Sequence, residues 1–325
     1  MYINPKFSVI DGHVDTVYQL PKDKRIFSER NEKGHYDLPR MKEGKIQAAL
    51  FAIYPTSSMN YILKSLDNWF KLVTNASNGL KQIKNLNDFK EAQNSSKKGA
   101  ILHFEGAGGI DNNLRFLRIA YQLGLRTLGL SWANVNKFAT GAMFKDPQKE
   151  TGLTKKGREL VAEAQSLGIT IDVSHLNEPS FWDVHEVAQQ PIFASHSNAR
   201  SIVDHPRNLT DDQIKAIHEK KGTVGINFGM GFLNAEKPGE DNYEMGFDSI
   251  KNQIDHIVKI TDINTVAIGS DFDGTKTPSC LKDCSKYPDL WNYLLENGYS
   301  ELDIEKISHK NLLRVFKDTW KSNSF

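Results

Sequence analysis

The stretch AILHFEGAGGIDNNLRFLRIAYQLGLRTLGL, residues 100–130, contains one complete repeating unit of the fold. A short apolar run at Ala100–Phe104 is followed by Asn113–Leu123, where apolar residues recur every three or four positions, and then by a second apolar run at Thr127–Leu130. Gly124 directly follows the helical pattern, a position where glycine commonly ends a helix. Strand, helix, glycine and strand in this order are typical of a parallel βαβ unit.

The same order recurs along the chain. Eight runs are too short for helices and have the apolar character of strands buried on both faces. They are Phe7–Ile10, Ala48–Ile53, Ala100–Phe104, Thr127–Leu130, Thr170–Val173, Ile192–Ala194, Thr223–Asn227 and Val266–Gly269. Helical patterns lie between them, for example at Thr154–Leu167, Asp211–Lys221 and Ser249–Ile260. The pattern predicts one α/β domain over residues 1–325, a (β/α)8 TIM-type barrel.

Two further features belong to this prediction. The tail from Asp289 to Trp320 holds two further helical patterns, and we expect these extra C-terminal helices, from about residue 289, to pack outside the barrel. The two longest connections, Val14–Ile46 and the stretch after Phe228, are polar and contain glycine, so we expect them to form lids over one face.

Composition excludes several classes of protein. The chain is 39% hydrophobic and 25% charged, and its formal net charge of +1 gives no reason to expect a nucleic-acid partner. No apolar run approaches the roughly 20 residues of a membrane helix, and the first residues lack the pattern of a signal peptide. We therefore expect a cytoplasmic protein without a membrane partner, in which Cys280 and Cys284 are unpaired thiols.

Polar residues gather directly after the apolar runs. The runs lead into DGHVD at 11–15, HFEG at 103–106, DVSH at 172–175, ASHSNAR at 194–200 and GSDFDG at 269–274. The carboxyl ends of barrel strands meet at one mouth, and the active sites of barrel enzymes lie there. We therefore expect these side chains to converge.

Five of these residues have the chemistry of metal ligands. His13 and Asp15 are two apart, so an extended strand points both to the same side. His175 and His196 end consecutive runs, and neutral imidazoles suit zinc or another borderline metal. Glu105 ends a run between the two pairs, and its two oxygens can bridge two cations. Each residue alone has a plainer explanation, as a buried histidine or an ion-paired carboxylate, but together they predict a two-metal site.

A two-metal site at a barrel mouth predicts hydrolytic chemistry. Two cations sharing a water would lower the pKa of that water and polarise a carbonyl. Asp271, after the eighth run, is placed to take the proton from the water and pass it to a leaving amine. The alternative role for Asp271 is to orient a metal-bound histidine.

These motifs together resemble the renal or membrane dipeptidase family of zinc peptidases, within the amidohydrolase-like barrels. The matching pieces run in the family's order along nearly the whole chain: DGHVDT at 11–16, FEG at 104–106, DVSH at 172–175, SHSNAR at 195–200, RNLTDD at 207–212, GSDFDG at 269–274 and SKYPDL at 285–290. The resemblance implies a dipeptidase of the bacterial cytoplasmic type, acting on small dipeptides. It also implies two Zn²⁺ per chain, with manganese or cobalt left open, and a homodimer by analogy.

The resemblance assigns roles to the ligands. His13 and Asp15 would hold one zinc, His175 and His196 the other, and Glu105 would bridge them.

The resemblance also concerns the substrate. Arg207 matches the family's arginine that binds the terminal carboxylate, which suits the planar guanidinium. Without the family, Arg207 would be read as a surface arginine before a helix. Asp271 and Asp273 compete for the role of acid and base, and we choose Asp271 because it comes first after the strand. Asp273 is then expected to shape the turn at Gly274.

One position departs from the family. Trp132 stands where mammalian members carry a histidine thought to stabilise the oxyanion, and an indole cannot carry a positive charge. We keep Trp132 and Asn136 as candidate substrate-binding residues, with Asn134 as another donor, although loop asparagines more often serve turns. The departure leaves open a related two-metal amidohydrolase acting on N-acyl amino acids, lactams or cyclic amides. A metal-loaded barrel that binds peptides without cleaving them is the alternative of another class.

Overall fold

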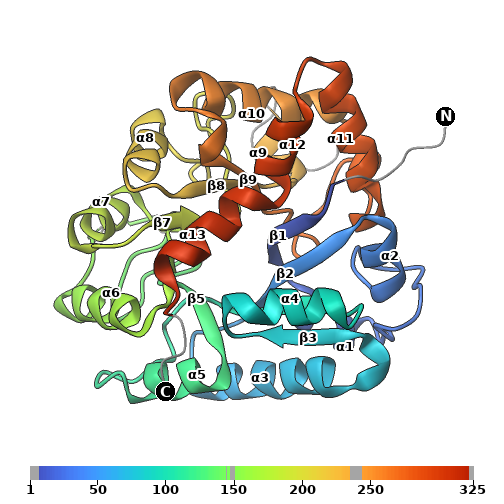
Figure 1. Ribbon diagram of the computed structural model, residues 1–325. Helices are drawn as coiled ribbons and strands as arrows, with labels where there is room; N and C mark the ends of the chain where they lie inside the picture. The colour runs from blue at the N-terminus through green and yellow to red at the C-terminus, as the bar shows by residue number, and fades with distance from the viewer. Residues whose placement is uncertain (1–6, 144, 147–150, 235–243, 322–325) are drawn as a thin grey trace.

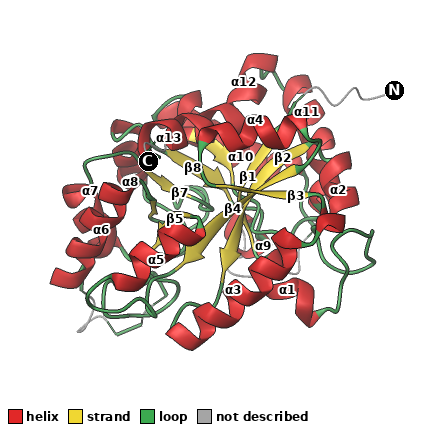
Figure 2. Cartoon of the chain, turned by 60° about the horizontal axis from the view of Figure 1, so that its bottom comes forward, coloured by secondary structure: helices red, strands yellow, loops and turns green. Residues whose placement is uncertain are grey.

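The computed structural model describes residues 7–143, 145–146, 151–234 and 244–321. Its centre is a set of parallel strands that nearly closes into a barrel, with helices around it (Figures 1 and 2). Eight strands follow one another around the barrel: β1 (Val9–Val14), β2 (Ile46–Ile53), β4 (Lys98–Glu105), β5 (Leu125–Gly129), β6 (Thr170–Asp172), β7 (Ile192–Ala194), β8 (Thr223–Ile226) and β9 (Val266–Ile268). The predicted (β/α)8 barrel is confirmed.

A ninth strand, β3 (Leu80–Ile83), was not predicted. It pairs with the first half of β4, from Lys98 to Ile101, whereas β5 pairs with the second half, from Leu102 to Glu105. β3 therefore extends the sheet outside the barrel wall. Its sequence LKQI is short and half polar, so no apolar run marked it.

The helices are α1 (Thr16–Lys22), α2 (Leu38–Glu43), α3 (Met59–Thr74), α4 (Leu86–Asn94), α5 (Arg115–Leu123), α6 (Lys155–Leu167), α7 (Glu178–Val187), α8 (Asp211–Glu219), α9 (Met230–Leu233), α10 (Phe247–Ile260), α11 (Tyr287–Glu296), α12 (Glu301–Glu305) and α13 (Asn311–Thr319). Sequence signals set their ends. Gly124 and Gly168 follow α5 and α6 with φ of 111° and 91°, the left-handed conformation that suits a glycine cap. Thr210 and Gln213 form a capping box at the start of α8.

Hydrogen bonds join the first and last barrel strands. Val14 forms a parallel bridge with Phe272, just after β9. On β1, the buried Asp11 carboxylate accepts hydrogen bonds from the Ser270 hydroxyl and the Tyr287 hydroxyl, both at 2.7 Å. Burial raises the pKa of Asp11, and these donors oppose the rise. The closure thus brings the residues after β9 beside those at the end of β1.

The end of the chain covers the amino-terminal end of the barrel. After α12, a π-helical turn at Lys306–Lys310 leads into α13, which crosses in front of the strands in Figure 1. Phe316 and Trp320 join a core cluster with the strand residues Ile10, Ile101 and Phe193. The tail therefore closes the end of the barrel opposite the strands' carboxyl ends. Within the described ranges, no helix combines the length and apolar character needed to cross a membrane.

Replacing Trp320 with alanine should lower the free energy of unfolding by roughly 3–5 kcal/mol, because it removes a large buried side chain. Trp320 is 6% exposed, stacks on Phe316 with ring centroids 4.5 Å apart, and donates its indole N–H to Thr170 at 3.1 Å. Urea denaturation gives the measurement. Trp182→Ala is the control and should cost far less, because Trp182 is 37% exposed. Equal losses would contradict the closing role of Trp320.

Candidate active site

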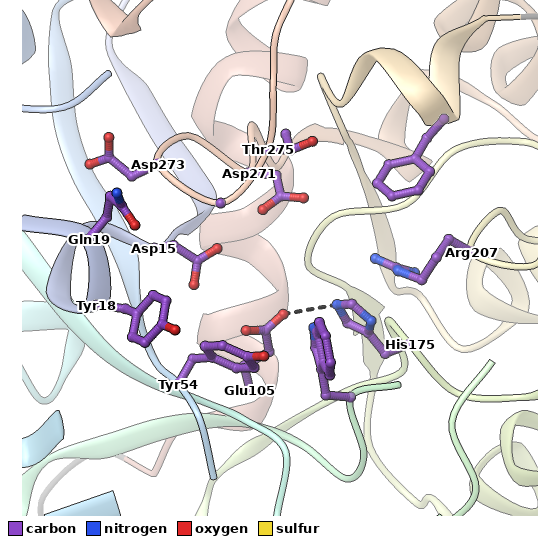
Figure 3. Close-up of a pocket in the computed structure, with 13 residues that line it drawn as sticks. Asp15, Tyr18, Gln19, Tyr54, Glu105, His175, Arg207, Asp271, Asp273 and Thr275 are labelled. Carbon is purple, nitrogen blue, oxygen red and sulfur yellow. Dashed lines mark ion pairs between the residues drawn. The ribbon is translucent and has the colours of Figure 1, made fainter. Parts of the chain in front are cut away.

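A pocket of about 310 Å³ lies at the carboxyl end of the strands (Figure 3). Its wall includes six of the predicted site residues: Asp15, Glu105, Trp132, His175, Arg207 and Asp271. Two more, His13 and His196, are completely buried. The barrel thus brings together residues that are up to 258 positions apart, from His13 to Asp271.

The five predicted metal ligands form one cluster around Glu105. Glu105 Oε1 lies 2.9 Å from His175 Nε2 and 3.7 Å from the Nε2 atoms of both His13 and His196. His13 Nε2 also lies 3.4 Å from Asp15 Oδ2. Two groups of three ligand atoms, each within 4.8 Å, share the carboxylate: His13 with Asp15 and Glu105, and Glu105 with His175 and His196.

Unpartnered polar atoms show that this cluster fits a metal ion. Among the described residues, His13 Nδ1 and Nε2, Asp15 Oδ1 and His175 Nδ1 are buried without a hydrogen-bond partner. Leaving such atoms unpaired is costly unless a cation or another partner is supplied. Imidazole nitrogens and carboxylate oxygens are ligands that zinc accepts. Each of the two groups is therefore a suitable set of donors for one divalent cation.

Burial and mutual charge shift the titration of the cluster. Burial opposes the charged form of His13, but Glu105 and Asp15 outweigh it and raise the His13 pKa to about 10. Burial and the Asp15 carboxylate hold the pKa of Glu105 well above its usual range. Burial, together with nearby positive groups, keeps the pKa values of His175 and His196 well below the usual histidine value. These two imidazoles therefore stay neutral, the form that binds metals.

The backbone at the pocket is unusual. His175, Asp271 and Asp273 have φ of 68°, 63° and 68°, the left-handed region that costs a non-glycine residue of order 1–3 kcal/mol. Gly274 lies close beside them: a Cβ there would lie 2.0 Å from Asp15 Oδ2 and 2.4 Å from Asp271 Oδ1, so these carboxylates would have to move. The strained backbone at Asp271 and Asp273, and the close contact of Gly274 with two carboxylates, indicate that the conformation of the turn after β9 serves the site.

The two competing aspartates differ in their surroundings. Asp273 Oδ2 accepts a hydrogen bond from Thr16 at 2.8 Å and pairs with Arg25 at 2.9 Å, so this carboxylate is bound to the connection that follows β1. Both aspartates line the pocket, but the Asp271 carboxylate has a different partner: its Oδ2 accepts a hydrogen bond from Asn227 at 3.0 Å. Burial and the Asp15 carboxylate raise the pKa of Asp271 to about 7. Asp271 also lies near His13 and His196 as a third group of ligand atoms.

Arg207 offers a positive charge to the pocket. Its guanidinium is buried, donates to the His196 carbonyl at 3.0 Å and lies 5.7 Å from the centre of the Phe232 ring. Among the described residues no carboxylate forms an ion pair with it, and its Nε has no hydrogen-bond partner. Figure 3 shows Arg207 across the pocket from Tyr18 and Tyr54. Arg207 can therefore receive an anionic group.

The other predicted substrate-binding residues differ in position. Trp132 is 42% exposed and lies against Tyr54 and His175, with ring centroids 5.1 and 6.0 Å away. The Asn136 amide is used within its own loop, donating to Leu130 and accepting from the backbone two and three residues on. Neither Asn136 nor Asn134 lines this pocket.

Several residues of the site were missed by the sequence reasoning. Tyr18 and Gln19 from α1 and Phe232 from α9 line the pocket, so both long connections do reach it. The rest of the second expected lid, residues 235–243, lies outside the described residues. Asn227 could have been found, because it ends the seventh apolar run as the other site residues end theirs.

Comparison with known proteins identifies the family of the chain. The profile of the membrane dipeptidases, peptidase family M19, matches residues 2–324. An uncharacterized dipeptidase of Schizosaccharomyces pombe is 32% identical over 338 aligned residues, covering 96% of this chain and 80% of the yeast protein.

Two solved structures are also similar. A metallopeptidase from Rhodobacter sphaeroides, liganded with a phosphinate mimic of the dipeptide L-Ala-D-Ala, is 30% identical with a TM-score of 0.89 over 97% of this chain and 99% of its own. The M19 metallopeptidase called dipeptidase AC is 31% identical with a TM-score of 0.89 over the same shares. The chain therefore belongs to the membrane dipeptidase family, M19, and is a metal-dependent hydrolase of the dipeptidase type.

Proposed function

We propose that this enzyme hydrolyses dipeptides with two zinc ions per chain, one held by His13 and Asp15 and the other by His175 and His196. The observation that carries the proposal is the position of Glu105, whose carboxylate is shared by two groups of ligand atoms. In the first group His13 Nε2 has no hydrogen-bond partner among the described residues, and in the second the Nε2 atoms of His175 and His196 have only each other, at 2.9 Å. When bound, the ions supply a water of lowered pKa and polarise the amide carbonyl. The chain's own residues supply binding, orientation and proton transfer.

The Arg207 guanidinium would bind the free carboxylate of the dipeptide. A buried, unpaired guanidinium prefers an anion, and a carboxylate matches its two parallel N–H donors. The pocket of about 310 Å³ has room for a small substrate. Arg207 would thus set the position of the amide relative to Glu105 and Asp271.

Asp271 would move the proton. Asn227 binds its Oδ2, so its Oδ1 is left to take a proton and to release it to the leaving amine. Without bound metal its pKa is about 7, and bound cations would lower that pKa, so that Asp271 is ionised at neutral pH and can accept the proton of the water.

The aromatic side chains of Tyr18, Tyr54 and Trp132 would enclose the amino-terminal part of the substrate, opposite Arg207. Because the Rhodobacter sphaeroides relative was liganded with a mimic of L-Ala-D-Ala, that dipeptide is the first substrate to test. Trp132, in place of the mammalian histidine, is the feature that favours the alternative substrates. Cleavage of N-acyl amino acids with no cleavage of any dipeptide would support that alternative.

We also propose a reducing, cytoplasmic setting, since Cys280 and Cys284 are both free. The homodimer stays a prediction from analogy.

Removal of metal should abolish turnover. Dialysis against a strong chelator should reduce the hydrolysis of L-Ala-D-Ala to background, and added zinc should restore it, because unpartnered ligands remain in place. Circular dichroism before and after chelation checks that the fold persists. Full turnover by protein shown to be free of metal would contradict the proposal.

Arg207→Ala should lower kcat/KM for dipeptides by about 30- to 1,000-fold, in line with loss of a buried charge pair of about 2–4 kcal/mol. The matched substrate is the same dipeptide with its carboxylate converted to an amide. Wild-type enzyme should prefer the acid strongly, and the variant should lose that preference. Equal losses on the acid and the amide would show that Arg207 does not bind the carboxylate.

Asp271→Asn should lower kcat about 100- to 10,000-fold, the usual range for losing a general acid or base. Wild-type activity should fall as the pH drops through the Asp271 pKa, because only the ionised form accepts a proton. Bound cations favour the ionised Asp271 carboxylate, so the loss of activity should occur below pH 7. The Asp271→Asn variant should show no such pH-dependent loss. Asp273→Asn is the control and should mainly reduce stability, because it removes the charge that pairs with the buried Arg25 at 2.9 Å. Unchanged kcat in Asp271→Asn would rule out the role.

A further inference from the structure

One imidazole of the metal-ligand cluster differs from the others in its second ring nitrogen. His196 Nδ1 lies 2.7 Å from the Ser195 hydroxyl. In contrast, His13 Nδ1 and His175 Nδ1 are buried without a hydrogen-bond partner among the described residues. The side chains around His196 therefore constrain which of its nitrogens carries the hydrogen.

The direction of the bonds follows from Asp172, the last residue of β6. Its Oδ1 accepts the backbone N–H groups of Ser174 and Ser195, both at 2.9 Å, and its Oδ2 lies 2.6 Å from the Ser195 hydroxyl. The carboxylate oxygen is the acceptor of this short contact, so Ser195 donates its single hydroxyl hydrogen to Asp172 rather than to the Ser174 hydroxyl, which lies farther away at 3.4 Å. The contact between Ser195 and His196 must then be a bond donated by His196 Nδ1–H. His103 Nε2 lies 3.5 Å from Asp172 Oδ2, so this oxygen faces an imidazole nitrogen as well as the Ser195 hydroxyl.

Close packing holds Ser195 in this arrangement. A Cβ on Gly269 would lie 1.7 Å from the Ser195 carbonyl oxygen, one on Gly225 2.1 Å from it, and one on Gly12 2.6 Å from it. Strands β1 and β8, and the residue that follows β9, thus approach the Ser195 backbone where only glycine fits. Ser195 is also completely buried, so bulk water does not compete for its hydroxyl.

We propose that Asp172 and Ser195 are positioning residues that fix His196 as the Nδ1–H tautomer and so leave the lone pair of Nε2 free to bind metal. This Nε2 faces the cluster, 2.9 Å from His175 Nε2 and 3.7 Å from Glu105 Oε1. A hydrogen on Nε2 would block binding, because a metal needs an unprotonated ligand atom. The consequence for metal affinity rests on the proposed function, whereas the tautomer does not.

The tautomer can be measured on the metal-free protein. In ¹⁵N NMR of the histidine-labelled chain, with the His196 signals assigned from a His196→Gln variant, Nδ1 should show the shift of a protonated nitrogen and Nε2 that of an unprotonated one. In Ser195→Ala the two shifts should move toward each other as the Nε2–H form becomes populated. Wild-type protein with the hydrogen on Nε2, or Ser195→Ala with unchanged shifts, would overturn the inference.

The effect on metal binding is tested by competition with a chromogenic chelator. Ser195→Ala and Asp172→Asn should weaken zinc binding at one site by about 10- to 100-fold, the usual cost of losing such a partner. Ser174→Ala is the matched control: its hydroxyl is also buried, accepts the His196 backbone N–H at 3.1 Å and lies 3.4 Å from the Ser195 hydroxyl, but among the described residues it bonds to no imidazole nitrogen. The zinc affinity of Ser174→Ala should stay close to that of the wild type. If Ser174→Ala lost as much zinc affinity as Ser195→Ala, the role of Ser195 would be structural only.

The two proposals fail in different ways. Wild-type protein that binds no zinc would contradict the metal proposal and leave the NMR result standing. Wild-type protein that binds zinc tightly, with Ser195→Ala binding it equally well, would contradict the positioning role alone.

Discussion

The Glu105 carboxylate, buried among the imidazoles of His13, His175 and His196, is the interaction on which the rest of the site depends. A carboxylate in such a place is costly unless positive charge compensates it. Without a cation the charge is shared within the cluster, with a raised pKa at Glu105 and a charged His13. Divalent cations would compensate the same carboxylate directly and would use the ligand atoms that now lack partners.

The barrel makes this concentration of charge possible. Its strands bring residues from β1, β4 and the ends of β6, β7 and β9 to one mouth, and α13 closes the opposite end. The wide separation of these residues along the chain means that the cluster exists only in the folded protein. The bonds of Asp11 between β1 and β9 are therefore connected to function as well as to stability, since they hold His13 beside Asp271.

Much of this could be predicted from the sequence because its signals are local. Buried parallel strands leave apolar runs, and the residues after each run belong to the mouth, so the barrel and its convergent polar residues followed. β3 was missed because its four residues carry no such signal, and the closing role of α13 depends on contacts with distant strands.

The remaining differences depend on hydrogen bonds that only the folded chain shows. Asn136 resembled a donor for the substrate, yet the chain folds its amide into its own loop. Asp271 and Asp273 look alike in sequence, and they are separated by their partners in the folded chain: Asp273 pairs with Arg25, whereas Asp271 accepts a hydrogen bond from Asn227. The role of Asp172 required the direction of each bond, which residue spacing does not contain.

The most direct test of the account is the zinc content of the purified, zinc-loaded protein by elemental analysis, compared with that of Glu105→Gln. The wild-type chain should bind two zinc ions, and the variant should lose at least one of them, because both groups of ligands share this carboxylate. A wild-type chain that retains no zinc, or a variant that retains both ions with unchanged affinity, would contradict this expectation.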